Sequence, residues 1–396
     1  MTDRLPDAEW TQRPDVRALV VALGDGNARY VGGAVRDTLL GLNVKDIDVA
    51  TPLKPAQVIA ACDAAGLRTV PTGLAHGTVT AVLPGGPVEI TTLRRDVATD
   101  GRHATVAFAQ DWREDAARRD FTINALYADP ANGAISDFFD GLADLAARRV
   151  RFVGNARQRI REDHLRILRY FRFQARFGSY PADKEAEQAC AELAPTLRGL
   201  SRERIGMELM NLLGLPDPSR AVERMAELGS LAVVLPEADP APLAALIAAE
   251  TREAAAPQAI RRLAALLPAD PSLAGDVAAR LRLSTTLKKH LTAVAARQSP
   301  SGDARALAYR LGRTEAEDIL LLAGDSLAPL ANWETPQFPL KGGSIVARGV
   351  SAGPAVARIL QTIEARWITE GFPDAARVSA LLDEALTQEL AQRTAK

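Results

Sequence analysis

The stretch that decides the fold is Arg29 to Thr51, which reads RYVGGAVRDTLLGLNVKDIDVAT. Tyr30-Val31 predicts a short apolar strand, and the strand breaks at Gly32-Gly33. A helix is predicted from Ala34 to Leu40, and it stops at Gly41. The order strand, glycine turn, helix and second strand indicates an α/β region at the start of the chain.

Two carboxylates follow this helix, because the second predicted strand carries Asp46 and Asp48. Residues two apart on a strand point to the same face. Burying two like charges side by side is costly unless a cation lies between them, and Mg²⁺ binds one or two carboxylates together with phosphate oxygens. The glycine pair lets backbone N–H groups approach a phosphate, and Arg36 and Lys45 add positive charge. The stretch therefore predicts a site for a nucleoside triphosphate and its metal.

Taken alone, a glycine pair is usually a turn and an Asp-x-Asp pair is usually a solvated loop. The ordered combination is more specific, and it resembles the signature of the class II tRNA nucleotidyltransferase and poly(A) polymerase family, within the polymerase-β-like superfamily. The resemblance implies that Asp46 and Asp48 hold the catalytic metal. It also implies that Gly33 and Arg36 contact the nucleotide.

The composition limits the class of protein. The 396 residues allow two to four domains, and the formal net charge of −1 argues against a generally basic nucleic-acid binder. No apolar run approaches the roughly 20 residues that span a membrane, and the first ten residues lack the apolar segment of a signal peptide. Cys62 and Cys190 are too few for a disulfide framework. We expect a cytoplasmic protein without a membrane segment.

The region up to about residue 149 mixes helix and strand patterns. We expect a helix over Pro55 to Ala65 and two strands, Thr78 to Leu83 and Val88 to Thr92, joined as a hairpin by Pro-Gly-Gly-Pro at 84–87. The polar stretch Asp96 to Ala104 indicates a mobile loop, and the family has a flexible loop at this place.

Helical periodicity begins near Leu145 and continues almost to the end of the chain. The predicted fold class is therefore α+β, with a small polymerase-β-like head on a mixed sheet and an all-helical remainder. The predicted divisions are a catalytic head (1–147), a neck that recognises the base (148–210), a body (211–330) and a tail that contacts tRNA (331–396).

The sequence Arg118-Arg119-Asp120-Phe121-Thr122-Ile123-Asn124-Ala125 resembles the family's second motif. Asp120 and Asn124 are four residues apart, so on a helix they share a face and can hydrogen-bond a ribose 2′-OH. The resemblance implies that Arg119 meets the triphosphate. The alternative is a surface helix with an internal Arg–Asp pair.

The segment from Asp129 to Leu145 resembles the third motif and contains Asp137, Asp140 and Asp144. Asp-Pro and Asn-Gly pairs within it suit tight turns. We expect these aspartates to do structural work, joining head to neck, with metal binding as the alternative.

The segment from Arg161 to Arg172 places four polar residues at intervals of three, which predicts a polar ridge on one helix; they are Asp163, Arg166, Arg169 and Arg172. Asp accepts a hydrogen bond from the exocyclic amine of cytosine or adenine, and Arg donates to a ring nitrogen or carbonyl. Guanine and uracil present the wrong order of donors and acceptors, so a buried pair would reject them. The alternative is an ordinary amphipathic helix with an Asp–Arg pair.

This segment resembles the family's fourth motif. The resemblance implies that Asp163 and Arg166 read the base and that Arg169 and Arg172 support the nucleotide. Ten arginines between Arg148 and Arg176 face only two acidic residues of the same stretch, a local net charge of +8 that suggests an RNA-backbone surface. Arg204 and Glu208, in a segment that resembles the fifth motif, are expected to pair on one helix.

The sequence favours an enzyme that adds CCA to tRNA 3′ ends from CTP and ATP, with Mg²⁺ and without a template. A poly(A) polymerase, or an enzyme that adds only part of CCA, shares these motifs. From a different class, the chain could be a catalytically silent RNA-binding protein, but such a protein would not require Asp46, Asp48, Asp163 and Arg166 together.

Overall fold

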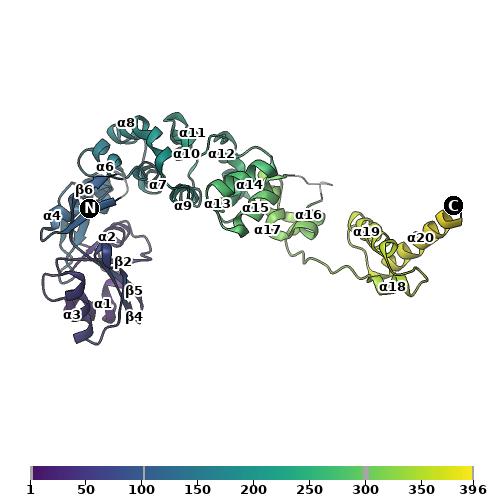
Figure 1. Cartoon of the computed structure of the whole chain (residues 1–396), viewed down its shortest axis with the longest axis horizontal. Coiled ribbons are helices and arrows are strands. Elements are labelled where there is room, and N and C mark those ends of the chain that lie inside the picture. Colours follow the sequence, from purple (N-terminus) through teal and green to yellow (C-terminus); the bar gives the residue numbers. More distant parts are fainter. Residues whose placement is uncertain (1–2, 101–102, 298–302, 395–396) are drawn as a thin grey trace. The chain divides into compact units, whose positions relative to one another are not determined.

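The protein is described from a computed structural model, which covers residues 3–100, 103–297 and 303–394. Its contacts divide the chain into two compact units, Met1–Pro240 and Ala241–Lys396 (Figure 1). None of the helices that these residues form combines the length and the apolar character needed to cross a membrane. The predicted α+β fold class is confirmed, while the finer division into head, neck, body and tail stays a prediction.

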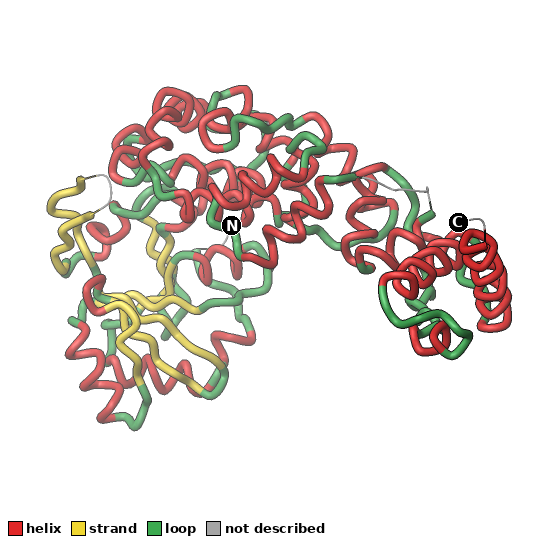
Figure 2. The backbone as a smooth tube through the Cα atoms, turned by 45° about the vertical axis from the view of Figure 1, so that its right-hand side comes forward, coloured by secondary structure: helices red, strands yellow, loops and turns green. Residues whose placement is uncertain are grey.

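The first unit contains a mixed sheet of seven strands in the order β3-β4-β5-β2-β1-β8-β9. Figure 2 shows the strands, in yellow, gathered at one end of this unit, and helices form most of the rest of the unit. Strands β2 and β5 run parallel and the other neighbours are antiparallel. The strands are β1 (Arg29–Val31), β2 (Ile47–Thr51), β3 (Thr69–Gly73), β4 (Thr78–Leu83), β5 (Gly86–Thr92), β8 (Leu126–Ala128) and β9 (Ile135–Asp137).

The two faces of the sheet are assigned by the pairing of β1 with β2. Tyr30 lies opposite Val49, so both project from one face, and Arg29 lies opposite Ala50 on the other. Because side chains alternate along a strand, Asp48 projects from the same face as Ala50. We call the face that carries Asp48 the front face and the face that carries Tyr30 the back face.

The predicted hairpin forms as expected, because β4 and β5 pair from Thr78↔Thr91 to Leu83↔Gly86 around the glycine turn. The prediction of a mobile loop over Asp96 to Ala104 was wrong for the part that the structure describes, and 101–102 lie outside the described residues. Strands β6 (Arg94–Asp100) and β7 (His103–Phe108) form a separate two-stranded antiparallel sheet there. Alternating threonine, alanine and valine suit a strand, and the polar and glycine residues had obscured this pattern.

Helices surround the sheet and then continue alone to the end of the first unit. Helix α7 lies at the centre of this region, and its aromatic side chains Tyr170 and Phe173 pack against Phe121, while Tyr170 stacks on Phe152. The helices are α1 (Pro14–Leu23), α2 (Gly33–Leu39), α3 (Pro55–Ala64), α4 (Trp112–Ala117), α5 (Gly141–Ala146), α6 (Ala156–Glu162), α7 (Arg166–Phe177), α8 (Lys184–Leu193), α9 (Arg202–Leu213), α10 (Ser219–Glu227) and α11 (Ser230–Val234). The 3₁₀ turns are η1 (Glu9–Gln12), η2 (Leu74–His76), η3 (Thr122–Asn124) and η4 (Ala194–Gly199).

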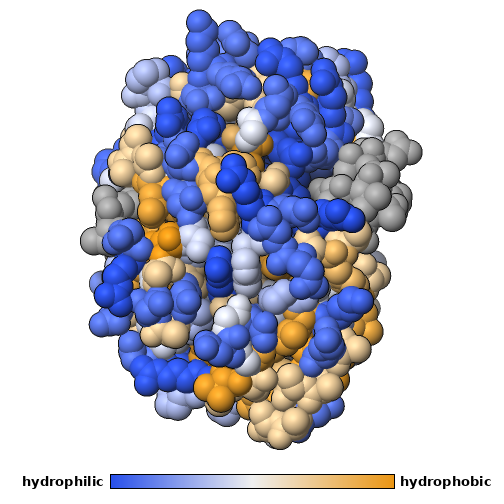
Figure 3. Space-filling model, turned by 90° about the vertical axis from the view of Figure 1, so that its left-hand side faces the viewer, coloured by the Kyte–Doolittle hydropathy of each residue, from blue (hydrophilic) through white to orange (hydrophobic). Residues whose placement is uncertain are grey.

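The surface of the chain is mostly polar with scattered apolar side chains. On the face shown in Figure 3, hydrophilic residues cover most of the upper half and apolar residues gather towards the lower edge. Exposed apolar side chains of the first unit include Val21, Leu74 and Met207. Isolated exposed apolar residues of this kind are normal for a folded protein.

The second unit is helical and holds an unusual set of buried charges. Arg261 donates to Glu250 and Asp318 at 2.8 Å each, and Arg262 donates to Glu250 at 2.7 Å. His290 contacts Asp318 at 2.7 Å, so the network joins four helices. The elements are α12 (Ala241–Arg252), α13 (Ala259–Leu266), α14 (Pro271–Arg280), α15 (Thr285–Ala295), α16 (Ala304–Leu311), α17 (Arg313–Ala323), η5 (Ala328–Leu330), α18 (Gly342–Val346), α19 (Pro354–Thr369) and α20 (Ala375–Thr394).

Candidate active site

Asp46 and Asp48 lie at the start of β2 on the front face. Asp46 immediately precedes the strand and is exposed, and Asp48 is the second residue of the strand and is partly buried. Buried Ile47 separates them and points to the back face. Within the described ranges, neither carboxylate has a hydrogen bond or an ion pair to the protein. Both carboxylates are therefore available to an external group.

Glu89 is a third acidic residue beside this pair, and the sequence analysis missed it. It lies in β5, directly opposite Asp48 in the parallel pair of strands. Directly opposed residues on adjacent strands project from the same face. The signal that could have found it is a single acidic residue in the strand Val88-Glu89-Ile90-Thr91-Thr92, which is otherwise apolar or hydroxyl-bearing.

The charge balance around Asp48 is negative. Burial is the largest cause, and together with the negative charges of Glu89 and Asp46 it raises the pKa of Asp48 to about 6, while Arg119 opposes the shift. A raised carboxyl pKa means that the protein does not supply enough positive charge to stabilise the carboxylate. Such a site favours the binding of a cation.

The donor set suits Mg²⁺, which binds oxygen ligands and usually takes only one or two carboxylates from the protein. In the part of the chain that the structure describes, no three His, Cys, Asp or Glu side chains are arranged to hold a metal ion by themselves. A metal at Asp46 and Asp48 would thus draw its remaining ligands from water or from a bound phosphate.

The glycine turn packs closely against Asp48 and Arg119. Gly32 has a φ of 68°, which favours glycine, and a Cβ at this position would lie 3.3 Å from Arg119 Nη1 and 4.0 Å from Asp48 Oδ2. Gly33 begins α2 directly after it. The turn, Arg119 and Asp48 therefore form one contiguous surface on the front face.

Arg119 is held by the core of the sheet. Its guanidinium donates to Tyr127 Oη at 3.1 Å and to Asp115 Oδ2 at 3.3 Å. Burial opposes the charged form, but Tyr127 and Asp115 outweigh it, and the pKa of Arg119 is raised. Arg119 thus remains a fixed positive charge next to the carboxylates.

Arg36 is buried and faces α7. Its guanidinium pairs with Asp37 at 2.7 Å, donates to Asn124 Oδ1 and lies over the ring of Phe177 at 4.1 Å. Only 6% of the residue is exposed. The structure therefore places Arg36 where the sheet-bearing part meets α7, behind the glycine turn.

Asp120 and Asn124 lie beside Arg36. They are in contact, with Asn124 Nδ2 donating to Asp120 Oδ1 at 2.9 Å, but they do not lie on the α-helix that their spacing predicted: Asn124 ends the 3₁₀ turn η3, and Asp120 lies just before this turn. Arg169 of α7 donates to Asp120 Oδ2 at 2.9 Å. Burial alone would raise the pKa of Asp120, but Arg169, Asn124 and the N–H of Phe121 lower it to about 2.

The prediction that Asp163 and Arg166 lie on one helix was wrong. Asp163 follows the last residue of α6 in an extended conformation, and α7 begins at Arg166. Asp163 Oδ1 accepts the N–H of Leu165 at 3.1 Å, so its carboxylate caps the chain where it turns into α7. The two residues are neighbours at this joint, although they are not bonded to each other.

Arg166 is bound to protein acceptors. It donates to Glu162 at 2.7 Å, to the Arg159 carbonyl at 2.9 Å and to the Arg118 carbonyl at 3.1 Å. These bonds use its two terminal nitrogens. Its Nε–H has no acceptor among the described residues and remains a donor for a ligand.

The predicted pair of Arg204 with Glu208 does not form. Arg204 donates to Asp163 Oδ2 at 2.7 Å instead, and Glu208 is buried and accepts from Arg172 at 2.6 Å. Glu208 also lies 3.7 Å from Arg169. Tertiary partners outcompete the i, i+4 contact here because α9 packs directly against α7.

The local charge of +8 is largely neutralised in the folded chain. Most arginines of this stretch pair with carboxylates, several of them from distant segments such as Asp37, Asp120 and Glu192. The net charge of +8 was counted over residues 148–176 alone, so it does not include these carboxylates from distant segments. The pairs with arginines 149, 151, 157, 159, 166, 169, 172 and 176 are all within 4 Å.

The aspartates of the predicted third motif have structural contacts. Asp144 is fully buried and accepts from Thr122 Oγ1 at 2.6 Å and from Arg151 Nε at 2.8 Å. Asp137 accepts the N–H groups of Gly141 and Leu142 at 2.9 Å each. These bonds tie α5 and Arg151 to η3 and β9, so both aspartates make structural contacts; a role in joining head to neck stays a prediction.

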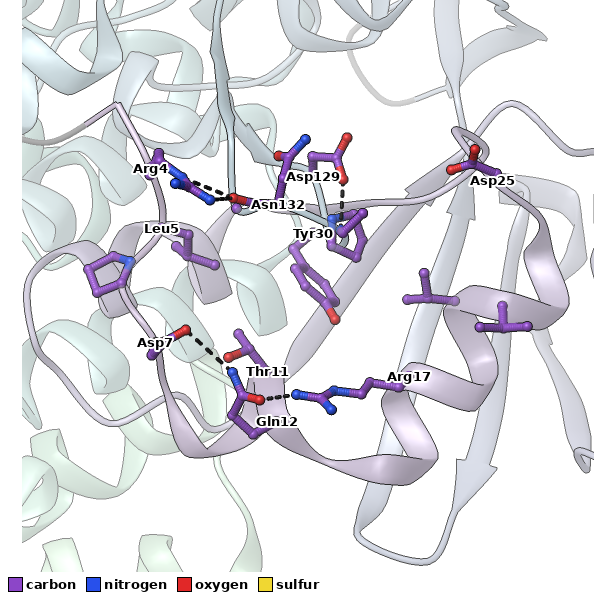
Figure 4. Close-up of a pocket in the computed structure, with 16 residues that line it drawn as sticks. Arg4, Leu5, Asp7, Thr11, Gln12, Arg17, Asp25, Tyr30, Asp129 and Asn132 are labelled. Atoms are coloured by element: carbon purple, nitrogen blue, oxygen red, sulfur yellow. Dashed lines mark hydrogen bonds between the residues drawn. The ribbon is translucent and has the colours of Figure 1, made fainter.

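A cavity of about 800 Å³ lies on the back face, away from the carboxylates. Tyr30 lines it, and Figure 4 shows the ring inside the cavity with its hydroxyl directed towards Thr11, Gln12 and Arg17. Because Tyr30 and Asp48 project from opposite faces of the sheet, this cavity is separate from the candidate active site.

Two family models match the first unit. The poly A polymerase head domain matches residues 28–151, and the probable RNA and SrmB- binding site of polymerase A matches residues 182–241. The first match contains the glycine turn, both carboxylates and the Arg119–Asn124 segment.

Curated proteins are similar over most of the chain. The mitochondrial CCA tRNA nucleotidyltransferase 1 of Mus musculus is 35% identical over 369 residues, which is 87% of this chain and 83% of the mouse protein. The Homo sapiens protein of the same name is 34% identical over 381 residues, with the same two coverages.

Solved structures share the fold. The crystal structure of the Bacillus stearothermophilus CCA-adding enzyme in complex with CTP has a TM-score of 0.76 and 28% identity, and the match covers 96% of this chain and all of the other. The Thermotoga maritima CCA-adding enzyme complexed with tRNA has a TM-score of 0.68 at 20% identity, over 95% of this chain and 98% of the other, and shows similarity of fold.

Proposed function

The chain belongs to the CCA tRNA nucleotidyltransferase family, and from this premise we propose that it adds CCA to the 3′ end of tRNA from CTP and ATP. Nucleotides are transferred without a nucleic-acid template, and pyrophosphate is released. The observation that carries the proposal is the pair Asp46 and Asp48, two carboxylates that bind no group of the described residues, with Asp48 beside the Gly32 turn.

Asp46 and Asp48 would hold Mg²⁺, with Glu89 adding negative charge from the neighbouring strand. When bound, Mg²⁺ would neutralise charge on the triphosphate and on the leaving pyrophosphate. The chain's own contribution is position: strand pairing fixes Asp48, Asp46 directly precedes the same strand, and Arg119 places a permanent positive charge next to Asp48.

The triphosphate would lie along the glycine turn, between Gly33 and Arg119. Close approach of backbone to phosphate needs a residue without a side chain, and a Cβ at Gly32 would lie 3.3 Å from Arg119 Nη1. Arg36 is buried, so its effect on the nucleotide would pass through Asn124, whose side-chain oxygen it binds. Asp120 and Asn124 would then meet the ribose as parts of this buried group.

Asp163 and Arg166 would read the base at the joint between α6 and α7. Asp163 is about one-third exposed, so its acceptor oxygen can reach an exocyclic amine if the bond to Arg204 is exchanged. Arg166 has its Nε–H left to donate. Arg169 and Arg172 would support the nucleotide from α7, where Asp120 and Glu208 hold them in place.

The tRNA would extend from this site along the helical part of the chain. We propose the divisions 1–147, 148–210, 211–330 and 331–396 as head, neck, body and tail, with the tail contacting tRNA. A cytoplasmic location also stays a proposal from the composition, since the mouse and human relatives carry the word mitochondrial in their names.

The test is incorporation onto a tRNA that lacks its terminal CCA, offered CTP and ATP singly and together, with the products sequenced. The proposal expects C-C with CTP alone and C-C-A with both nucleotides. Long A tails would indicate a poly(A) polymerase, and a product that stops after part of CCA would indicate a partial enzyme. Absence of any addition in Mg²⁺ would overturn the proposal.

A further inference from the structure

The N-terminal segment Asp3 to Arg13 lies before residue 28, where the matched head region begins. Arg13 donates to Gly86 O at 3.2 Å, and the part of the segment up to Trp10 is attached to the head at two further places. At the first, it extends the sheet beyond β9, because Leu5 N donates to Gly133 O at 2.8 Å and Ile135 N donates to Asp3 O at 2.9 Å. Figure 4 shows this part of the segment beside the back-face cavity.

Trp10 makes the second attachment. Its Nε1 donates to Thr38 Oγ1 at 2.9 Å, and Thr38 Oγ1 donates in turn to the carbonyl of Ala34 at 2.7 Å. The indole ring also meets the ring of Tyr30 edge-on, with the centroids 4.7 Å apart and the planes at 76°. Tyr30 and Thr38 are both buried, so the contacts of Trp10 are with fixed groups.

These two partners lie on either side of the glycine turn. Tyr30 is in β1, which enters the turn, and Thr38 is in α2, which leaves it. Trp10 therefore joins the two elements whose separation sets the position of Gly32. Trp10 contacts Tyr30 on the back face of the sheet, whereas Asp48 lies on the front face.

On the front face the turn packs against Arg119 and Asp48. A side-chain carbon at Gly32 would lie within 3.3 Å of Arg119 and 4.0 Å of Asp48, so the backbone itself is the neighbour of both groups. A small shift of β1 or α2 changes the distance from the turn to the site. The hydroxyl of Tyr30 makes no hydrogen bond to any residue of the described ranges, so it does not fix the strand from behind.

We propose that Trp10 is a positioning residue for the nucleotide site: it holds the β1–α2 turn against Arg119 and Asp48 from the opposite side of the sheet. The proposal rests on the proposed function, because it assumes that the triphosphate lies along this turn. It predicts that loss of the indole N–H weakens the binding of CTP and ATP and leaves the binding of tRNA unchanged.

The test compares Trp10→Phe, Thr38→Val and the double variant with the parent chain. Phe keeps a ring against Tyr30 and Val keeps the shape of Thr38, so each removes one end of the same hydrogen bond. We expect each to raise the KM for CTP and ATP roughly three- to tenfold, with kcat within about twofold and the KM for tRNA unchanged. Thr38→Val also removes the hydrogen bond to the Ala34 carbonyl, so the double variant should show no more than the effect of Thr38→Val alone.

Arg4→Ala is the control, because it loosens the first attachment, where Arg4 Nε donates to Asn132 O, and leaves Trp10 in place. It should lower the melting temperature without raising the KM for either nucleotide. A Trp10→Phe variant whose melting temperature falls while both nucleotide KM values stay unchanged would overturn the proposal.

Calorimetric titration with CTP in Mg²⁺ separates this inference from the proposed function. A higher Kd for CTP in Trp10→Phe supports the positioning role even if the parent chain adds nucleotides other than CCA. An unchanged Kd contradicts the role, whatever product the enzyme makes.

Discussion

Arg204 Nη2 donates to Asp163 Oδ2 at 2.7 Å, and this bond joins α9 to the joint between α6 and α7. The candidate base-reading carboxylate is therefore oriented by a helix that begins nearly 40 residues after it. Its other oxygen caps the chain at Leu165. Asp163 thus combines a tertiary contact with a proposed role in recognition.

The first prediction follows from this double role. Asp163→Ala removes the acceptor for an exocyclic amine, and loss of a buried hydrogen bond costs about 1–3 kcal/mol, or roughly ten- to a hundredfold. We expect poorer use of CTP and ATP and weaker discrimination against UTP and GTP in a competition among the four nucleotides. Glu192→Ala, which breaks the exposed pair with Arg157, is the matched control and should leave selectivity unchanged. If Asp163→Ala slows all four nucleotides equally, the residue only supports the fold.

The second prediction concerns the carboxylates. Asp46→Ala and Asp48→Asn should abolish nucleotide addition in Mg²⁺ while the fold survives. Asp48→Asn should also raise the free energy of unfolding at pH 7 by about 1–3 kcal/mol, because the folded chain holds the ionised carboxyl at a pKa of about 6. Denaturant unfolding and an incorporation assay measure the two effects. Near-normal addition by either variant would contradict the assignment.

The third prediction is the pH dependence of the same site. A carboxyl pKa raised above its unfolded value means that stability is fully present below the unfolded pKa and is lost as pH rises through the folded value near 6. The pH dependence of activity has the opposite sign, because the proposed metal site needs Asp48 in its ionised form. The rate of CTP addition should therefore fall as pH drops through about 6. Glu89→Gln should move this midpoint to lower pH, and an unmoved midpoint would count against Asp48 as the titrating group.

The fourth prediction concerns the β6–β7 hairpin. It follows the candidate site in the sequence and forms a sheet of its own, so it can be shortened without cutting the seven-stranded sheet. We expect replacement of 97–105 by a short glycine linker to stall products at the CC stage while addition of C persists. Sequencing of the tRNA ends measures this. Full CCA from the shortened chain would refute a role in the change from C to A.

The fifth prediction tests the buried charges of the second unit. The hydrogen bond to Asp318 raises the pKa of His290, burial opposes this, and Glu315 adds to it. The stabilisation is therefore fully present below the unfolded pKa and is lost as pH rises through the folded value. His290→Gln should destabilise the chain by on the order of 1 kcal/mol at pH 5.5 and by less at pH 8.5. Equal losses at both pH values would show that protonation is not involved.

The fold was predictable where local patterns dominate. The glycine turn, the helix after it and the hairpin around 84–87 lie within about two residues of their predicted places. The β6–β7 hairpin was missed because polar and glycine residues in the sequence obscured its alternation of threonine, alanine and valine. The break between α6 and α7 was missed because the spacing of three from Asp163 onwards imitates a continuous helix.

The parts of the site were less predictable because they depend on partners far away in the sequence. Glu89 comes next to Asp48 through a parallel strand pairing, which no local pattern reveals. Arg204 and Glu208 are placed for a helical pair, yet each binds a residue of another segment. Burial of Arg36 follows from the aromatic face of α7, which lies about 140 residues away in sequence.

Asp120 has a further consequence. Its carboxylate accepts from the N–H of Phe121, from Asn124 and twice from Arg169, which uses all of its roughly four acceptor positions. A ribose hydroxyl that donates to Asp120 must therefore displace one of these donors. If the displaced donor belongs to Arg169, binding of the sugar also breaks the ion pair that joins α7 to the segment before η3. Sugar recognition and a weaker contact between Asp120 and α7 would then be one event.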